Sequence, residues 1–162
     1  MSTRIGGLPW VLAVALSLVA CASPSRIPDL AADTWAGRLS VRVESEPVQS
    51  FAAGFDLQGN TRAGSLSLYS PLGGTLAQLT WSPGQALLRS GGKEQTFDSL
   101  DALTRHAMGA ELPVAGIFSW LAGKPANPDG WTIDAQSRAD GRLVARRFSP
   151  APVVEMRLIL DQ

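Results

Sequence analysis

The sequence predicts an α+β fold in which short helices cover one face of a long, strongly curved antiparallel sheet. Apolar and polar residues alternate in several runs between residues 35 and 97, the period of half-buried strands. Residues 98–123 switch to helical spacing, and alternation returns from residue 131. About nine strands make a long sheet, and long twisted sheets tend to curl. A curled sheet under helices can enclose an apolar concave cavity, but periodicity does not decide whether that interior is filled or hollow.

The first 34 residues are expected to lie outside this domain. Arg4 precedes an apolar run from Leu8 to Ala20, which is short for a transmembrane helix and has the form of a secretory signal. The run ends in LVAC, which resembles the bacterial lipoprotein box and includes Cys21, the one cysteine. The alternative is a plain secretory signal followed by a free thiol, which is a liability in an oxidising compartment.

The lipoprotein-box resemblance implies that residues 1–20 are a signal peptide and that Cys21 is lipidated. The sulfur would carry a diacylglyceryl group and the nitrogen an acyl chain, and no other cofactor is expected. Such chains anchor a protein at about 0.8 kcal/mol per buried methylene. Ala22, in place of Asp, implies sorting to the outer membrane, on its periplasmic face. Residues 21–34 then form a lipidated N-terminus and tether, and residues 35–162 form the domain.

The runs before residue 98 each place their apolar side chains on one face. The residues expected to point inward are Trp35, Leu39, Val41 and Val43; Phe51, Ala53, Phe55 and Leu57; Leu66 and Leu68; and Ala77, Leu79 and Trp81. Turn residues separate these runs, and residues 85–97 are typical of a further hairpin through Gly91 and Gly92.

The helical insert is predicted as two short helices. The first spans residues 98–108, with Asp98 or Ser99 at its start and Gly109 at its end. Its apolar face is expected to hold Leu100, Leu103, Ala107 and Met108. The second follows Pro113 and presents Ile117, Trp120 and Leu121. Strands are then predicted at 131–136, 142–148 and 153–160, the last with Val154, Met156, Leu158 and Leu160 facing one way.

Composition and motifs exclude several classes of function. The formal net charge is zero and only two lysines occur, which argues against nucleic-acid binding. His106 is the one histidine, is expected to be solvated, and leaves no metal-ligand set. No nucleophile elbow, phosphate loop or dinucleotide fingerprint occurs, so no enzyme is predicted. Phe148 and the other aromatic residues are expected in the core, and Arg146 and Arg147 at a solvated strand edge.

A set of ordered motifs resembles the LolB family of outer-membrane lipoprotein receptors. It includes WAGRLSV from Trp35, SPLGGT ending at Thr75, the Asp-led helix, Gly109 before Leu112 and Pro113, and the W-x-x-G-x-P run from Trp120 to Pro125. Each motif alone is weak, but together they span most of the mature chain. The chain departs from many relatives in being shorter and in the brief loop between Arg147 and Val153, which bears on the details of the late strands.

The resemblance implies an unclosed β-barrel whose helices close one opening over a hollow, apolar interior. It implies a receptor that accepts lipoproteins from a LolA-like periplasmic carrier and inserts them into the outer membrane. The expected partners are that carrier, client lipoproteins through their acyl chains, and outer-membrane lipid, with the protein acting as a monomer and binding no nucleic acid. Arg38, Arg42, Arg89, Arg146 and Arg147 are candidates for the carrier-facing surface.

Two groups of site residues follow from the resemblance. The resemblance implies that Pro71, Leu72 and Gly73 form a membrane-insertion loop. A leucine at a hairpin tip is also unusual turn chemistry. The acyl-chain cavity is expected to be lined by Leu39, Val41, Phe51, Phe55, Leu66, Leu68, Leu79, Trp81, Leu103, Ile117, Trp120 and Leu121. The alternative is that Leu72 folds back and caps the apolar end of the sheet, and a singly exposed leucine is common in any case.

Two other functions stay open from the residues alone. A structural lipoprotein subunit of an outer-membrane assembly machine would share the signal and the β-rich body but would have a filled core. A lipid-modifying enzyme would have to rely on the lone His106.

Overall fold

The computed structural model describes residues 33–134 and 141–161. The predicted signal peptide, Cys21 and most of the predicted tether lie outside the described residues, as do the last two residues of the predicted strand 131–136. The first described strand begins at Asp33, two residues before the expected start of the domain at Trp35.

Nine strands form one antiparallel sheet in the described ranges. They are β1 (Asp33–Val43), β2 (Gln49–Gly59), β3 (Gly64–Tyr69), β4 (Thr75–Ser82), β5 (Gln85–Ser90), β6 (Lys93–Phe97), β7 (Trp131–Asp134), β8 (Arg142–Arg147) and β9 (Val154–Leu160). Their order is β6-β5-β4-β3-β2-β1-β9-β8-β7, so the last strand returns to lie beside the first. The outer strands β6 and β7 do not pair with each other, and the sheet is therefore not closed.

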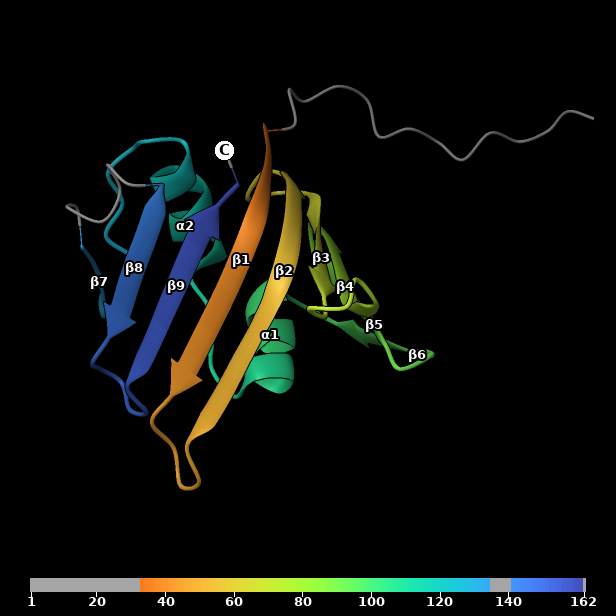
Figure 1. Cartoon of the computed structure of the whole chain (residues 1–162), viewed down its shortest axis with the longest axis horizontal. Coiled ribbons are helices and arrows are strands. Elements are labelled where there is room, and N and C mark those ends of the chain that lie inside the picture. The colour runs from red at the N-terminus through yellow and green to blue at the C-terminus, as the bar shows by residue number, and fades with distance from the viewer. Residues whose placement is uncertain (1–32, 135–140, 162) are drawn as a thin grey trace, which may run out of the picture.

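Two short helices lie on the same side of this sheet. Figure 1 shows β3–β6 turning away from β1, β2, β8 and β9, so that the sheet curves partly around α1 (Leu100–Met108) and α2 (Val114–Leu121). The Oγ of Ser99 accepts a hydrogen bond from the Ala102 N–H and caps α1, as one of the two predicted caps. Gly109 ends the helix with φ at 72°, a left-handed conformation that glycine adopts without strain. The predicted α+β class and antiparallel sheet are confirmed.

The core lies between the concave face of the sheet and the helices. The residues predicted to face inward are buried or half-buried along β1–β4, and Val154, Met156 and Leu158 of β9 are at most 3% exposed. From the helices, Leu103, Met108, Ile117, Phe118 and Trp120 complete the core. Ala107, predicted on the buried face of α1, is exposed in the last turn, where Thr104 and Met108 fill that face instead.

The structure contradicts two expectations at the end of β8. Arg147 was expected at a solvated edge, but its side chain points inward with Leu143 and Ala145 and is only 7% exposed. Its guanidinium lies 5.8 Å from the centre of the Trp131 ring, a favourable cation–π position. Phe148 was expected in the core, but it follows the last residue of the strand and is 59% exposed. Both residues follow the alternation of the strand, which buries positions 143, 145 and 147 and leaves 146 and 148 exposed.

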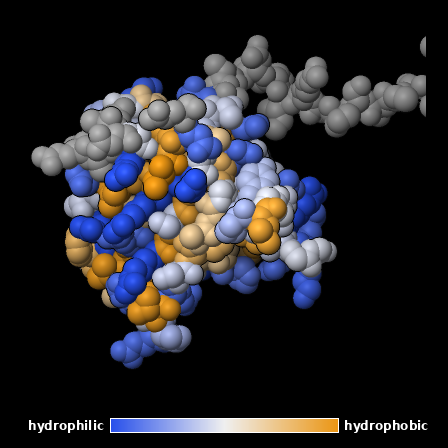
Figure 2. Space-filling model, in the orientation of Figure 1, coloured by the Kyte–Doolittle hydropathy of each residue, from blue (hydrophilic) through white to orange (hydrophobic). Residues whose placement is uncertain are grey.

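The convex face of the sheet is polar and carries ion pairs. Figure 2 shows hydrophilic side chains grouped over β1, β8 and β9, with apolar residues between them. Glu155 accepts hydrogen bonds from the Nε of Arg146 and of Arg157, at 2.6 and 2.7 Å. The bond from Arg146 is the main cause that holds the pKa of Glu155 below its ordinary value, against an opposing effect of burial.

The strands are staggered at the end where β3 turns into β4. Tyr69, the last residue of β3, lies opposite Gly54 of β2, which in turn lies opposite Arg38 in the middle of β1. The β3–β4 connection therefore leaves the sheet about halfway along β1, whereas the β1–β2 connection lies at the far end of β1.

Candidate functional site

The interior between helices and sheet contains a small apolar cavity. Its volume is about 40 Å³, room for a few water molecules at most. The lining residues are Leu39, Phe55, Leu57, Leu66, Leu79, Trp81, Leu100, Thr104, Met108, Leu112, Val114, Ile117, Met156 and Leu158. All but Thr104 are apolar. The predicted acyl-chain cavity thus has an apolar lining in the right place, but a volume that would hold a fatty acyl chain is not confirmed.

The twelve predicted cavity residues fall into three groups. Six line the cavity: Leu39, Phe55, Leu66, Leu79, Trp81 and Ile117. Val41, Leu68, Leu103 and Trp120 are buried in the surrounding core, and Phe51 and Leu121 are half-buried beside it. Their role in binding acyl chains stays a prediction.

Eight lining residues are missing from the predicted set. Leu57, Met156 and Leu158 share inward faces with predicted residues, and Leu100 and Met108 lie on the predicted face of α1. The strand and helix periods place these five residues on the buried faces, so the sequence could have predicted them as lining residues. Leu112 lies in the connection between the helices, where no period applies. Val114 is the first residue of α2, three positions before the predicted Ile117. Thr104 is polar and would not be chosen for an apolar wall.

Thr104 is acceptable inside because its hydroxyl is satisfied. The Oγ1 donates to the Asp101 carbonyl at 3.1 Å and accepts from the Leu112 N–H at 3.2 Å. A buried hydroxyl without partners would cost free energy. The second bond also links α1 to the segment that leads into α2.

The loop Ser70–Gly74 presents a leucine to solvent. The Ser70 N–H donates to the Gly74 carbonyl at 2.8 Å, and the Gly73 N–H donates to the Ser70 carbonyl at 2.9 Å. The Ser70 Oγ accepts from the Gly74 N–H at 3.1 Å. These bonds close the loop on itself, and Gly73 takes φ at 83°. Leu72 is 98% exposed at the tip, so the alternative in which it folds back onto the sheet is wrong.

Four of the five arginines proposed for carrier contact are already engaged. Arg42, Arg89 and Arg146 pair with Glu44, Glu94 and Glu155, and Arg147 is buried. The partner Glu44 raises the pKa of Arg42 above its ordinary value, chiefly through the hydrogen bond between them. Arg38 is exposed on the convex face of β1 and makes no ion pair with another described residue.

Residues 33–134 and 141–161 offer little support for a metal site, a histidine-based active site or a membrane-spanning helix. No group of three His, Cys, Asp or Glu side chains lies close enough there to hold a metal ion. The His106 ring is exposed and lies 5.2 Å from the Phe97 ring, centre to centre. No helix in these ranges has the length and apolar character needed to cross a membrane.

Comparison with known proteins gives a consistent result. The family model for "Outer membrane lipoprotein LolB" matches residues 34–145. A protein of Thiobacillus denitrificans named "Outer-membrane lipoprotein LolB" is 34% identical over 182 aligned positions, covering 97% of this chain and 94% of that protein. Proteins of the same name from Chromobacterium violaceum and Cupriavidus metallidurans are 31% and 37% identical, over 82% and 80% of this chain and 74% and 68% of their own.

The family match runs from β1 into β8 and includes both helices and the exposed leucine loop. Its members are lipoprotein localisation factors rather than enzymes, and they are anchored by lipid at the outer membrane. The match agrees with the ordered motifs seen in the sequence. The chain belongs to the LolB family of outer-membrane lipoproteins.

Proposed function

We propose that this protein accepts acylated lipoproteins from a LolA-like periplasmic carrier into its apolar interior and inserts them into the outer membrane. The observation that carries the proposal is that the protein has both a buried apolar interior and an exposed apolar side chain. The interior is lined by leucine, methionine and aromatic side chains, and Leu72 stands 98% exposed on a self-contained loop. The first suits storage of acyl chains and the second suits contact with a bilayer.

Acyl chains would have to move the helices away from the sheet. The cavity of about 40 Å³ is far too small for a fatty acyl chain. The packing of α1 and α2 on the sheet is apolar, and a polar link between their connection and the sheet is long: Arg147 Nη1 donates to the Glu111 carbonyl at 3.5 Å. When the helices shift, the acyl chain packs against the sheet in place of the helix side chains. The exchange costs little, because the acyl chain and those side chains are both hydrocarbon.

Transfer would need no nucleotide. A methylene left in water costs about 0.8 kcal/mol, so a long acyl chain must pass directly from the carrier to this protein and then to the bilayer. Among the exposed arginines proposed for meeting an acidic carrier surface, Arg38 is the one that makes no ion pair with another described residue. Lipidation of Cys21 would keep the receptor at the membrane into which it releases its client.

Leu72 would act at the release step. A leucine side chain that enters the headgroup region gains apolar contact without disturbing the sheet, since the loop bonds are internal to residues 70–74. Pro71 and Gly73 flank it and fix the shape of the loop. Acceptance would thus use the interior, whereas insertion would use the loop.

The test is the substitution Leu72→Glu, with Val48→Glu as a matched control. Val48 is an apolar residue that is 49% exposed in the β1–β2 connection, at the far end of β1 from the loop. We expect Leu72→Glu to accept a lipoprotein from the carrier at the wild-type level and to leave it bound, whereas Val48→Glu both accepts and releases it. Normal release by Leu72→Glu into outer-membrane vesicles would contradict the proposed role of the loop.

A second measurement tests the interior. Binding of a fluorescent fatty acid should rise to saturation and should be displaced by an unlabelled acyl chain. A structural subunit with a permanently filled core would bind none. Normal sorting of lipoproteins after depletion of this protein in its host, with no accumulation of carrier-bound lipoprotein, would contradict the function as a whole.

A further inference from the structure

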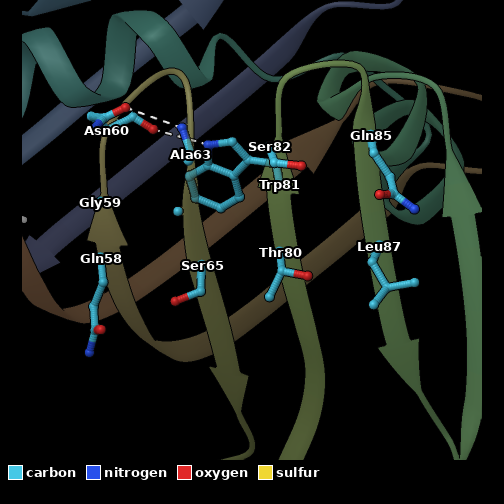
Figure 3. A pocket seen from close by; sticks show the side chains of 11 residues that line it. Gln58, Gly59, Asn60, Ala63, Ser65, Thr80, Trp81, Ser82, Gln85 and Leu87 are labelled. Carbon is cyan, nitrogen blue, oxygen red and sulfur yellow. Dashed lines mark hydrogen bonds between the residues drawn. The ribbon is translucent and has the colours of Figure 1, made fainter. Parts of the chain in front are cut away.

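An open groove of about 500 Å³ lies at one end of strands β2–β5. Figure 3 shows its side chains extending from four neighbouring strands and from the β2–β3 turn. The lining residues are Gln58, Gly59, Asn60, Ala63, Gly64, Ser65, Thr80, Trp81, Ser82, Gln85 and Leu87. Its volume is in the range of small-ligand sites.

None of the described residues that line the groove has an ionisable side chain. Its polar members are amides and hydroxyls, which both donate and accept hydrogen bonds. Elsewhere the convex face is rich in ion pairs, including those of Glu44, Glu94 and Glu155. A phosphate ligand is normally met by Arg, Lys or a helix N-terminus, and the part of the chain that the structure describes places none of these in the lining. The lining suits a ligand whose polar groups are uncharged.

Trp81 is shared by the groove and the apolar cavity. Its side chain is buried, with an exposed fraction of 7%, and its indole N–H donates to the Asn60 carbonyl at 3.0 Å, which fixes the ring beneath the β2–β3 turn (Figure 3). A Cβ on Gly64 would come within 2.5 Å of the Trp81 ring, so glycine at that position lets the ring lie against β3. One wall therefore faces a polar site on one side and an apolar interior on the other, an arrangement suited to an amphiphile.

We propose that the groove binds the uncharged head of the acylated client. This inference rests on the proposed function and names the part of the ligand that stays outside the interior. In a triacylated cysteine the amine is an amide and the glycerol oxygens are esters, so the head has hydrogen-bonding groups but no charge. The groove would hold these groups and the first peptide amides that follow, while the acyl chains enter the interior past Trp81. Phospholipids of the same membrane carry a phosphate, and the groove would discriminate against them.

The variant Thr80→Asp tests this, with Gln78→Asp as the matched control. Both residues are exposed on β4 and lie on the same face, but only Thr80 lines the groove. The probe is a fluorescent triacylated cysteinyl peptide without charged side chains, added to the mature chain in detergent micelles. We expect Thr80→Asp to raise the Kd about tenfold, because a carboxylate would face ester and amide carbonyls. Gln78→Asp should stay within about twofold of wild type, since a surface charge away from the site has a small effect.

A second experiment uses the protein in its own envelope. A photo-crosslinking side chain at Ser65, which lines the groove, should capture acylated lipoproteins, and one at Ser67, on the same strand and face, should not. Equal behaviour of Thr80→Asp and Gln78→Asp, or capture of phospholipid at Ser65, would overturn the groove assignment while leaving the proposed function intact. If the wild-type chain binds no lipopeptide, the proposed function itself fails.

Discussion

Leu72 and Leu79 stand seven positions apart and have opposite surroundings. Leu72, at the tip between β3 and β4, is 98% exposed, whereas Leu79, in β4, is 1% exposed and lines the apolar cavity. Both are leucines near one hairpin, so residue chemistry does not distinguish them. Their surroundings do: one is paired on both sides within the sheet, and the other lies on a loop bonded only to itself. Leu79 therefore contributes to folding, and Leu72 is available for contact with another surface.

Substitution of Leu79 should have the largest effect on stability. Leu79→Ala is expected to lower the free energy of unfolding by about 2–5 kcal/mol, because burial is reduced and the cavity is enlarged. Urea denaturation of wild type and variant, analysed with one m-value, measures this loss in the free energy of unfolding. Leu76→Ala, on the same strand but 39% exposed, is the control and should cost much less. Equal costs would mean that the inner face of β4 is not the packed side.

Removal of the Thr104 hydroxyl should have the next largest effect. Thr104→Val keeps the shape but leaves the buried Leu112 N–H without its acceptor, at an expected cost of about 1–3 kcal/mol. Thermal and urea unfolding should show that Thr104→Ser, which keeps the hydroxyl, is closer to wild type. A neutral effect of Thr104→Val would show that the N–H finds another partner.

The ion pairs of Glu155 should contribute less and should depend on pH. Because the pKa of Glu155 is lowered in the folded protein, its ion pairs stabilise the fold above the ordinary carboxyl pKa. That contribution is lost as the pH falls through the lowered pKa. Glu155→Gln should therefore cost about 0.5–1 kcal/mol at neutral pH and nothing in acid. A difference that persists in acid would point to packing rather than charge.

Substitution of Leu72 should have the smallest effect on stability. Leu72→Ser is expected to change the free energy of unfolding by less than about 0.5 kcal/mol, because the exposed side chain packs against nothing in the fold. Chemical denaturation measures the free energy of unfolding. A separate assay measures release of lipoprotein into membranes, which we expect to decrease. Together with Leu79→Ala, the result would separate folding from insertion on one hairpin. A large loss of stability would show that the loop packs on the sheet.

The strands and helices were predictable because both obey simple periods. Alternation identified β1–β4 and β9, and the Ser99 cap and Gly109 marked α1. The predictions for Arg147 and Phe148 were wrong because they followed the type of side chain rather than its position in the strand alternation. Arg147 continues the alternation of Leu143 and Ala145, but its charge suggested solvent; the fold buries it against Trp131.

The site was predictable in part, because faces can be read from sequence but enclosed volumes cannot. Leu57 and Met156 shared faces with predicted lining residues. The volume of the interior depends on how closely the helices approach the sheet, which no local pattern encodes. The polar groove escaped prediction for a related reason: Gln58, Ser65, Thr80 and Gln85 come from four strands and are brought together only by their register.

The stagger of the sheet sets the reach of the exposed loop. The β3–β4 connection leaves the sheet level with Arg38, five positions along β1 from Asp33, which is about 17 Å at roughly 3.3 Å per residue. The eleven residues from Ala22 to Ala32 span at most about 36–40 Å when fully extended. Under the proposed function, a lipidated Cys21 would let the anchor and the loop touch one bilayer together. Leu72 would then meet the membrane at an effective concentration set by the tether, in the millimolar range for short flexible linkers. One apolar side chain would suffice where a freely diffusing protein would need a larger patch.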